Sequence, residues 1–471
     1  MDAIELVYAG AAEQARLIRD GEVTARELVE ATLARIEALN PRLNAYRVVF
    51  ADRALAEADQ ADARSAAGQE RPLLGVPVSI KDDADVAGAT TAWGSLATSE
   101  EPRRADSDVV TRLRAAGAIV IGKTLTPELT IWPFTETLAF GATRNPWNRA
   151  YTPGGSSGGA GAAVAAGLCG VAMGSDGAGS IRIPSSFCGL FGIKPQRDRI
   201  SLGPEHRDAW HGLSVYGPLA RHVADAALFL DVTADEVPAG GFAAALETPL
   251  EPLRIAVSVK PPPGAITKLG DAQRRALEET ADVLRELGHE VFEREVDYPP
   301  AAFLTVVARY LRGIRDDAAG LPHPERLERR SRAMARLGGL ISDAQLAKAR
   351  GAEPAIAAQI NTIFDAADAV LLPGPAGPPF RIGELQGRGA IWTLNAVASR
   401  VPWYGIWNAI GQPAASVPAG FDAAGLPLSA QLAGRPGDEV TLLRLAAQLE
   451  EARPWAARRP PLDGPAAVPG A

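Results

Sequence analysis

Residues that build covalent or metal-bound frameworks are scarce in this chain of 471 residues. Only two cysteines occur, Cys169 and Cys188, and both lie within apolar sequence. Two cysteines supply neither a disulfide framework nor a four-cysteine zinc site. We therefore expect both thiols to be reduced and to lie in the core.

An excess of positive charge is missing as well. The chain has 48 Lys and Arg against 56 Asp and Glu, which gives a formal net charge of -8. Because proteins bind phosphate groups through clustered Lys and Arg, this balance argues against nucleic acid or an anionic membrane as the main partner and favours a small neutral or apolar ligand. Asp2 and Glu5 stand where a secretory signal has basic and then apolar residues, so we expect a cytoplasmic protein.

One stretch, from residue 150 to residue 175, has no charge at all. It is long enough for a membrane span, but it consists mainly of Gly, Ala and Ser and is broken by Pro153 and GGSSGG. Such a composition is too weakly hydrophobic to favour lipid. We expect a buried helix that packs closely through its small residues.

Hydrophobic periodicity predicts helices that alternate with short strands. Helices are expected at residues 11–39 (two of them), 51–67, 107–116 and 271–287. Buried strands are expected at residues 76–80, 118–124, 253–260 and 289–296. This alternation predicts an α/β protein with a largely parallel sheet.

Two glycine-flanked serine sites stand out. Ser156 and Ser157 lie in GGSSGG, and Ser180 ends the sequence GAGS. Glycine lets the backbone turn its N–H groups inward, so GAGS can form a nest of donors beside a serine hydroxyl. This combination favours a nucleophilic serine beside an oxyanion hole, although a single GAGS also occurs in tight turns with a purely structural serine.

A base for such a serine is hard to find among the five histidines, because none lies in a glycine-rich turn. The G-x-S-x-G elbow of α/β-hydrolases is also absent around Ser180. Lys81 is a better candidate, because it stands at the end of the strand predicted at 76–80. Burial would lower its pKa and let it act as a neutral base, provided that neither Asp82 nor Asp83 pairs with it.

Longer motifs connect these sites. They are GVPVSIKD around Lys81, then GGSSGG, D-x-x-G-S-I-R-x-P and CGLFGIKP. In combination they resemble the amidase signature family, over most of the chain and least between about residues 237 and 370. The resemblance implies an α/β fold with a large mixed, mostly parallel β-sheet covered by helices on both faces.

The same resemblance implies one domain over residues 1–460. Its catalytic core would comprise residues 70–236 and 371–445, and residues 237–370 would form a variable region on the substrate side. We expect a disordered tail at residues 461–471. A homodimer is compatible with the sequence, which leaves the oligomeric state open.

By position in the motifs, the resemblance implies a Ser–cis-Ser–Lys triad. Ser180 would be the nucleophile, Ser156 the bridging serine after a cis peptide bond, and Lys81 the base. The oxyanion hole would use the N–H groups of Gly177, Ala178, Gly179 and Ser180. No metal or cofactor is required by this chemistry.

Three further residues, Asp176, Ser157 and Arg182, match family positions that brace the turn through hydrogen bonds. The chain departs from the family pattern at Ala178, where many relatives have glycine. Alanine keeps its N–H group but restricts φ, so the oxyanion hole survives if this position needs no positive φ.

The segment PELTIWPFTETLAFG aligns with the family loop on the acyl side of the active site. Ile131, Trp132 and Phe134 make it large and apolar, whereas the A subunit of glutamyl-tRNA amidotransferase has a small polar Gly-Ser-Ser there. We therefore expect a stand-alone serine amidohydrolase that cleaves apolar or aryl amides through an acyl-enzyme, with carbamates and esters as further substrates. Core packing is the simpler explanation of the same aromatic side chains.

Two other functions stay open. The chain could be an amidotransferase A subunit, or it could be a non-catalytic or nucleotide-binding protein that uses the glycine-rich loop. GGSSGG lacks the lysine of a phosphate-binding P-loop, which argues against the nucleotide. The partner that we expect is a small amide or carbamate.

Overall fold

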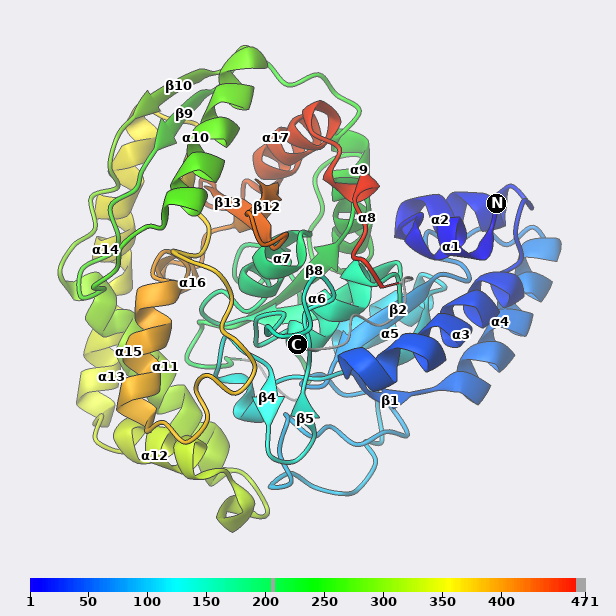
Figure 1. Ribbon diagram of the computed structural model, residues 1–471, viewed down its shortest axis with the longest axis horizontal. Coiled ribbons are helices and arrows are strands. Elements are labelled where there is room, and N and C mark those ends of the chain that lie inside the picture. Colours follow the sequence, from blue (N-terminus) through cyan, green and yellow to red (C-terminus); the bar gives the residue numbers. More distant parts are fainter. Residues whose placement is uncertain (205–207, 463–471) are drawn as a thin grey trace.

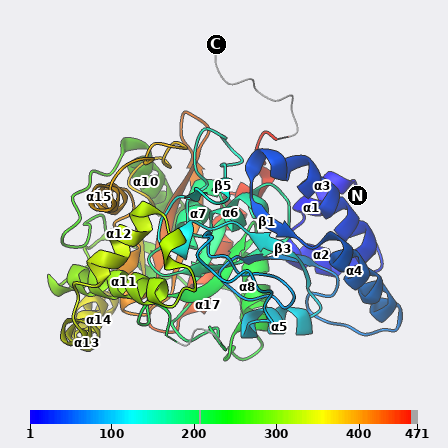
Figure 2. The ribbon, with the colours of Figure 1, turned by 90° about the horizontal axis from the view of Figure 1, so that it is seen from below.

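The computed structural model describes residues 1–204 and 208–462, and in it helices surround one large sheet (Figure 1). Most of the tail predicted at residues 461–471 lies outside the described residues. The N-terminal helices and the helices formed by about residues 300–400 lie at opposite ends of the molecule in both ribbon views (Figures 1 and 2).

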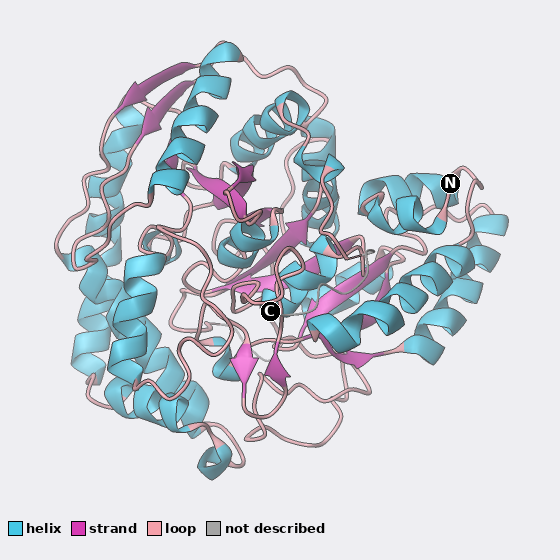
Figure 3. Ribbon diagram, viewed as in Figure 1, coloured by secondary structure: helices cyan, strands magenta, loops and turns pink. Residues whose placement is uncertain are grey.

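The sheet has eleven strands in the described part of the chain (Figure 3). In spatial order they are β1 (Tyr46–Val49), β3 (Ile119–Thr124), β2 (Pro77–Lys81), β6 (Val171–Asp176), β8 (Val215–Ala220), β7 (Phe191–Lys194), β12 (Ala414–Phe421), β13 (Pro427–Ala433), β11 (Ala369–Pro373), β9 (Arg254–Val257) and β10 (Glu290–Glu293). A separate small ribbon is formed by β4 (Glu136–Thr137) and β5 (Gly141–Ala142).

Strand direction is mixed, as expected for the fold. The runs β3-β2-β6 and β11-β9-β10 are parallel. The six other neighbouring pairs are antiparallel. The α/β class and the large mixed sheet are therefore confirmed, but parallel pairing dominates only within those two runs. Between them the strands alternate in direction, partly because β12 and β13 form a hairpin around Gly425, which has a φ of 75°.

Three helices precede the first strand: α1 (Ala3–Tyr8), α2 (Ala11–Arg19) and α3 (Ala25–Leu43). Helix α4 (Ala51–Ala66) follows that strand. The central helices are α5 (Asp108–Ala115), α6 (Gly158–Ala165), α7 (Arg182–Cys188), α8 (Val223–Thr233), α9 (Phe242–Ala245) and α10 (Asp271–Glu286). The remaining ones are α11 (Ala301–Ala319), α12 (Arg329–Gly338), α13 (Asp343–Gly351), α14 (Glu353–Asn361), α15 (Ala390–Arg400), α16 (Gly405–Ala409) and α17 (Glu439–Ala452). The predicted helices match α2, α3, α4, α5 and α10 to within a few residues.

Helices cover both faces of the sheet, as the alternation of side chains along β6 shows. Val171 and Met173 join the core beneath α8, whereas Ala172 between them joins the core beneath α6. Helix α6 packs against β2, β3, β6 and β8, and α8 packs against β6, β7 and β8. The expected two-sided cover is therefore confirmed.

The uncharged stretch contains α6, in which every residue is buried. A side chain at Gly159 would place its Cβ 2.5 Å from the carbonyl oxygen of Ala45 and 2.4 Å from the amide nitrogen of Leu125. Only glycine therefore lets the helix approach this backbone so closely. The expected close-packed, buried helix is confirmed, and no described helix is long and apolar enough to cross a bilayer.

Candidate active site

Lys81 ends β2, and its side chain is completely buried. The neighbouring parallel strand β6 is in register with β2 so that Ile80 pairs with Met173. The ends of the two strands therefore meet at one edge of the sheet. There the Nζ atom of Lys81 lies 2.7 Å from Ser156 Oγ and 2.7 Å from Ser175 Oγ.

A carboxylate also lies next to this lysine. Asp83 Oδ2 is 3.4 Å from Lys81 Nζ and accepts a hydrogen bond of 2.5 Å from Ser175 Oγ. Burial lowers the pKa of Lys81, while the charges of Asp83 and of Asp176 oppose this effect. The net pKa is below the ordinary value. A neutral Lys81 was expected only if neither neighbouring aspartate paired with it, and Asp83 does pair with it. Burial nevertheless lowers the pKa of Lys81 more than this pairing raises it.

The serine-rich loop is fixed against the turn that carries Ser180. The peptide bond between Gly155 and Ser156 is cis, as the family resemblance implied. Ser157 donates its backbone N–H to the carbonyl oxygen of Ser180 at 3.1 Å, and its hydroxyl donates to the carbonyl oxygen of Ser175 at 3.1 Å. The two glycine-flanked serine sites, 24 residues apart in sequence, are thus adjacent.

Most of the glycine-rich turn is buried. Between Val171 and Ser180, only Ala178 and Ser180 are partly exposed. The φ of Ala178 is not positive, so alanine fits this position without backbone strain. Gly179 has a φ of 114°, and its N–H group donates to Asp176 Oδ1 at 2.6 Å.

That last contact corrects one expectation. The N–H group of Gly179 is already bound to the carboxylate of Asp176, so it does not point freely toward a substrate as an oxyanion-hole donor would. The backbone N–H groups of Gly177, Ala178 and Ser180 make no hydrogen bond with any of the described residues. These three amides stay available as donors.

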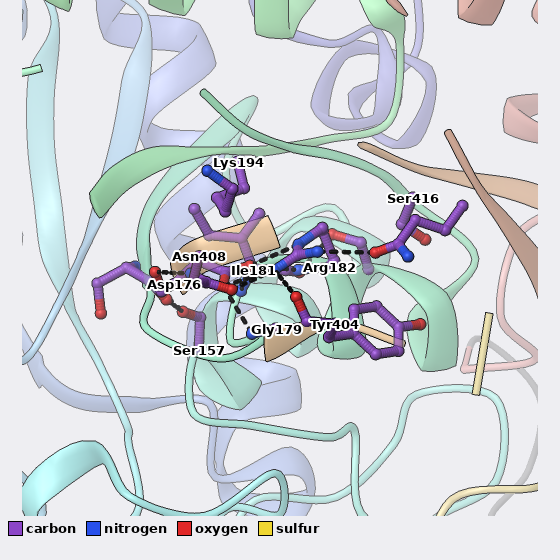
Figure 4. Close-up of polar contacts among 12 residues, drawn as sticks. Ser157, Asp176, Gly179, Ile181, Arg182, Lys194, Tyr404, Asn408 and Ser416 are labelled. Carbon is purple, nitrogen blue, oxygen red and sulfur yellow. Dashed lines mark hydrogen bonds and ion pairs between the residues drawn. The ribbon is translucent and has the colours of Figure 1, made fainter. Parts of the chain in front are cut away.

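A buried ion pair braces the turn, as Figure 4 shows. Arg182 Nε lies 3.0 Å from Asp176 Oδ2, and Arg182 Nη2 lies 3.0 Å from Asp176 Oδ1. Burial alone would raise the pKa of Asp176, but Arg182 and Asn408 outweigh it, and the net pKa falls well below its usual range. The carboxylate is therefore charged near neutral pH.

Further partners of this ion pair come from the C-terminal part of the chain (Figure 4). Asn408 on α16 donates its Nδ2 group to Asp176 Oδ1 at 2.9 Å and accepts from Arg182 Nη2 at 2.7 Å. Arg182 Nη1 donates to Gln431 Oε1 at 2.7 Å. The bracing role expected of Ser157, Asp176 and Arg182 agrees with these contacts. Asn408 and Gln431 were missed, because no motif connects them with residues more than 200 positions away.

Ser180 opens into a cavity of about 370 Å³. Ala178, Trp132 and Ile131 contribute to its wall beside the turn. A further part of the wall comes from two helices, through Ala302, Phe303, Val306, Val307 and Tyr310 of α11 and Leu394, Asn395, Val397 and Ala398 of α15. No described residue that lines this cavity carries a charged side chain.

Phe134 does not belong to this wall, which corrects the expectation that it contacts substrate. Its ring is buried and stacks on Trp132 with the ring centroids 5.8 Å apart, while Phe380 covers it edge-on at 6.2 Å. Arg330 of α12 lies over both rings, 5.5 Å from the centroid of Trp132 and 5.3 Å from that of Phe134. Phe134 thus supports Trp132 from behind.

Comparison with known proteins agrees with this geometry. The model of the Amidase family matches residues 27–443. The chain belongs to the amidase signature family. It is 56% identical over 461 residues to AmiB2 of Mycobacterium tuberculosis, an amidase by name, with 98% of this chain and 99% of that protein covered. It is 36% identical over 505 residues to the 6-aminohexanoate-cyclic-dimer hydrolase of Paenarthrobacter ureafaciens, with 99% of both chains covered.

Solved structures show the same likeness. A 6-aminohexanoate cyclic dimer hydrolase complexed with substrate superposes with a TM-score of 0.86 at 33% identity, covering 97% of this chain and 99% of that chain. A bacterial aryl acylamidase of the amidase signature family gives a TM-score of 0.84 at 26% identity, covering 95% and 97%. The chain is therefore an amidase of this family.

The ion pair yields a test of what holds the turn in place. Arg182→Met leaves the carboxylate of Asp176 buried without its main partner, so we expect the free energy of unfolding to fall by about 3–5 kcal/mol in urea denaturation. As a control, Arg285→Met on α10 removes an exposed pair with Asp282 and should cost less than about 1 kcal/mol. Equal losses in the two variants would show that the buried pair is not a major constraint.

Proposed function

We propose that this amidase is a serine amidohydrolase that cleaves the C–N bond of neutral, apolar amides through an acyl-enzyme on Ser180. The observation that carries the proposal is the contact between Lys81 Nζ and Ser156 Oγ at 2.7 Å, next to a serine that opens into an uncharged cavity. Ser180 itself makes no side-chain hydrogen bond with a described residue, so its hydroxyl is available to a substrate.

In the proposed acylation, neutral Lys81 accepts the proton of Ser156 while Ser156 accepts the proton of Ser180. The Ser180 oxygen attacks the carbonyl carbon of the amide, and the negative charge that develops on the carbonyl oxygen is stabilised by backbone N–H groups of residues 177, 178 and 180. The same relay returns the proton to the departing nitrogen, because an amide anion is a very poor leaving group. Water then hydrolyses the acyl-enzyme by the same route.

The cavity supports a neutral, apolar acyl group. Its wall offers hydrocarbon and aromatic surface but no charge that could compensate a charged substrate. One relative fits this reading by name, because a cyclic dimer of 6-aminohexanoate has no free terminus and hence no net charge. Carbamates and esters present the same carbonyl geometry, and we include them as further substrates.

The first test concerns the nucleophile and the base. A fluorophosphonate probe should label Ser180, and neither Ser180→Ala nor Lys81→Met should be labelled or turn over an amide, because each removes one end of the proton relay. Peptide mass spectrometry locates the label, and circular dichroism checks that both variants fold. Near-normal amide turnover in Lys81→Met would contradict the assigned base. Labelling at another serine would contradict the assigned nucleophile.

The second test concerns the acyl group. Succinamate carries a carboxylate where the apolar amide 3-phenylpropionamide carries a phenyl ring, and none of the described residues of the cavity wall has a charged side chain that could pair with it. We expect its kcat/KM to be lower by on the order of 100-fold or more, because the charge has to be desolvated without compensation. Hydrolysis of succinamate at a comparable kcat/KM would show that the acyl group lies elsewhere.

The third test concerns Asp83. Only the neutral form of Lys81 can accept a proton, so activity should fall as the pH drops through the pKa of this lysine. Asp83 stabilises the protonated form, since its carboxylate lies 3.4 Å away. The other charged group that faces Lys81 is Asp176, which stays unchanged. Asp83→Asn should therefore lower the pKa of Lys81 further and move the acid limb of the kcat/KM profile to lower pH.

A matched control for this variant is Asp282→Asn, which removes an exposed carboxylate on α10. It should leave the acid limb where it is in the unmodified protein. An acid limb that stays in place in Asp83→Asn, or moves to higher pH, would show that this limb does not report the titration of Lys81.

A further inference from the structure

A second, much smaller cavity lies at the lysine end of the proposed relay. Its volume is about 50 Å³. Asp83 and Ser175, the two residues that contact Lys81 Nζ together with Ser156, line it. Thr130 and Trp210 line both this cavity and the large apolar one, so the two cavities adjoin.

The wall of this small cavity offers acceptors that the protein itself does not use. Asp83 Oδ1 is buried and has no hydrogen-bond partner, while Asp83 Oδ2 is occupied by Ser175. Tyr216 also lines the cavity, is 4% exposed, and makes no side-chain hydrogen bond with a described residue. Ser175 and Tyr216 are paired across β6 and β8, so their side chains lie on the same face of the sheet. Buried polar groups without partners are rare unless a ligand or water satisfies them.

The charge of this wall favours a nitrogen ligand. Asp83 and Asp317 are its two charged residues, and no described Lys, Arg or His lines it. Asp317 accepts a hydrogen bond of 2.7 Å from Trp210 Nε1, which fixes its carboxylate. Carboxylates accept hydrogen bonds and donate none when ionised, so the wall suits an N–H group and repels an anion.

Its size limits what can bind. A single water needs roughly 10–15 Å³ of such space, so the cavity can hold about three or four waters or one small amine. Methylamine and ethylamine fit within that limit. A phenyl or cyclohexyl group is too large and would have to occupy the apolar cavity instead.

We propose that this cavity is the amine subsite of the enzyme, which receives the departing nitrogen with at most a small alkyl group. The proposal rests on the proposed function, because it assigns the second half of the same substrate. It makes primary amides and N-methyl or N-ethyl amides the preferred substrates, with the acyl group in the apolar cavity.

Acylation of Ser180 releases a neutral amine into this cavity. The Ser180 oxygen forms a bond to the carbonyl carbon, the C–N bond breaks, and the proton of Ser180 reaches the nitrogen through Ser156. The amine therefore leaves uncharged, and its N–H groups can donate to Asp83 Oδ1. Water enters the vacated cavity and attacks the acyl-enzyme in the reverse order of proton transfers. By microscopic reversibility, a small amine that binds there can attack in place of water.

Competition between water and added amines tests this subsite. An acyl-enzyme is formed from the ethyl ester of 3-phenylpropionic acid, and the ratio of amide to acid product is measured by chromatography with methylamine, ethylamine, cyclohexylamine or aniline present. At equal concentrations of free base, methylamine and ethylamine should give at least a 10-fold higher ratio than cyclohexylamine. Because all ratios come from one acyl-enzyme, differences in its rate of formation cancel.

Two variants fill the cavity without changing the relay. Ala209→Leu and Ser214→Val place extra carbon atoms in its wall, and each should reduce the methylamine ratio at least 5-fold. Ala344→Leu, an exposed position on α13, is the matched control and should leave the ratio unchanged. Should one of the filling variants fail to fold, the other still decides the outcome.

Two results would overturn the amine subsite: cyclohexylamine that competes as well as methylamine, or filled variants that keep the original ratio. Neither result touches the proposed nucleophile, which is tested separately by probe labelling of Ser180. Conversely, absence of labelling together with absence of any acyl transfer would remove the proposed function itself.

Discussion

The charge of Asp176 is the constraint on which the site depends. A carboxylate in a fully buried position is stable only if it is compensated, and here Arg182, Asn408 and the N–H group of Gly179 all point at it. Satisfying that charge fixes the backbone between residues 176 and 182. The turn can then present Ala178 and Ser180 to the cavity while its other residues stay covered. The same contacts tie α7 to α16 and β13, so the catalytic edge of the sheet is joined to the C-terminal part of the chain.

Lys81 shows a balance of a different kind. Its burial favours the neutral amine, and the nearby Asp83 favours the ammonium, so the two effects oppose each other. A lysine without the carboxylate would be neutral over a wider pH range, but Ser175 and Asp83 also fix where its nitrogen points. Polar groups thus gather at this end of the site, while the cavity beyond Ser180 is apolar. The separation lets proton transfer and substrate binding occur in different surroundings.

Much of this arrangement could be predicted from the sequence where one local pattern decided it. A short apolar run placed Lys81 at the end of a buried strand. The direction of Phe134 was not predictable, because neighbouring aromatic residues can face a cavity or a core. The direction of the Gly179 N–H group depends on the conformation of the loop, which amino-acid composition does not determine. Strand direction in the middle of the sheet depends on pairing between segments far apart in the sequence, which local patterns do not determine.

Apart from Ser180, which belongs to both, the residues of the relay and the residues of the large cavity come from different parts of the chain. The relay is built from strand ends and glycine-rich turns, whereas α11 and α15 contribute a large share of the cavity wall. Substitutions on those two helices can therefore accumulate without disturbing proton transfer. A fold arranged in this way is well suited to evolve new selectivity by drift of its outer helices, and directed evolution of this enzyme can begin there.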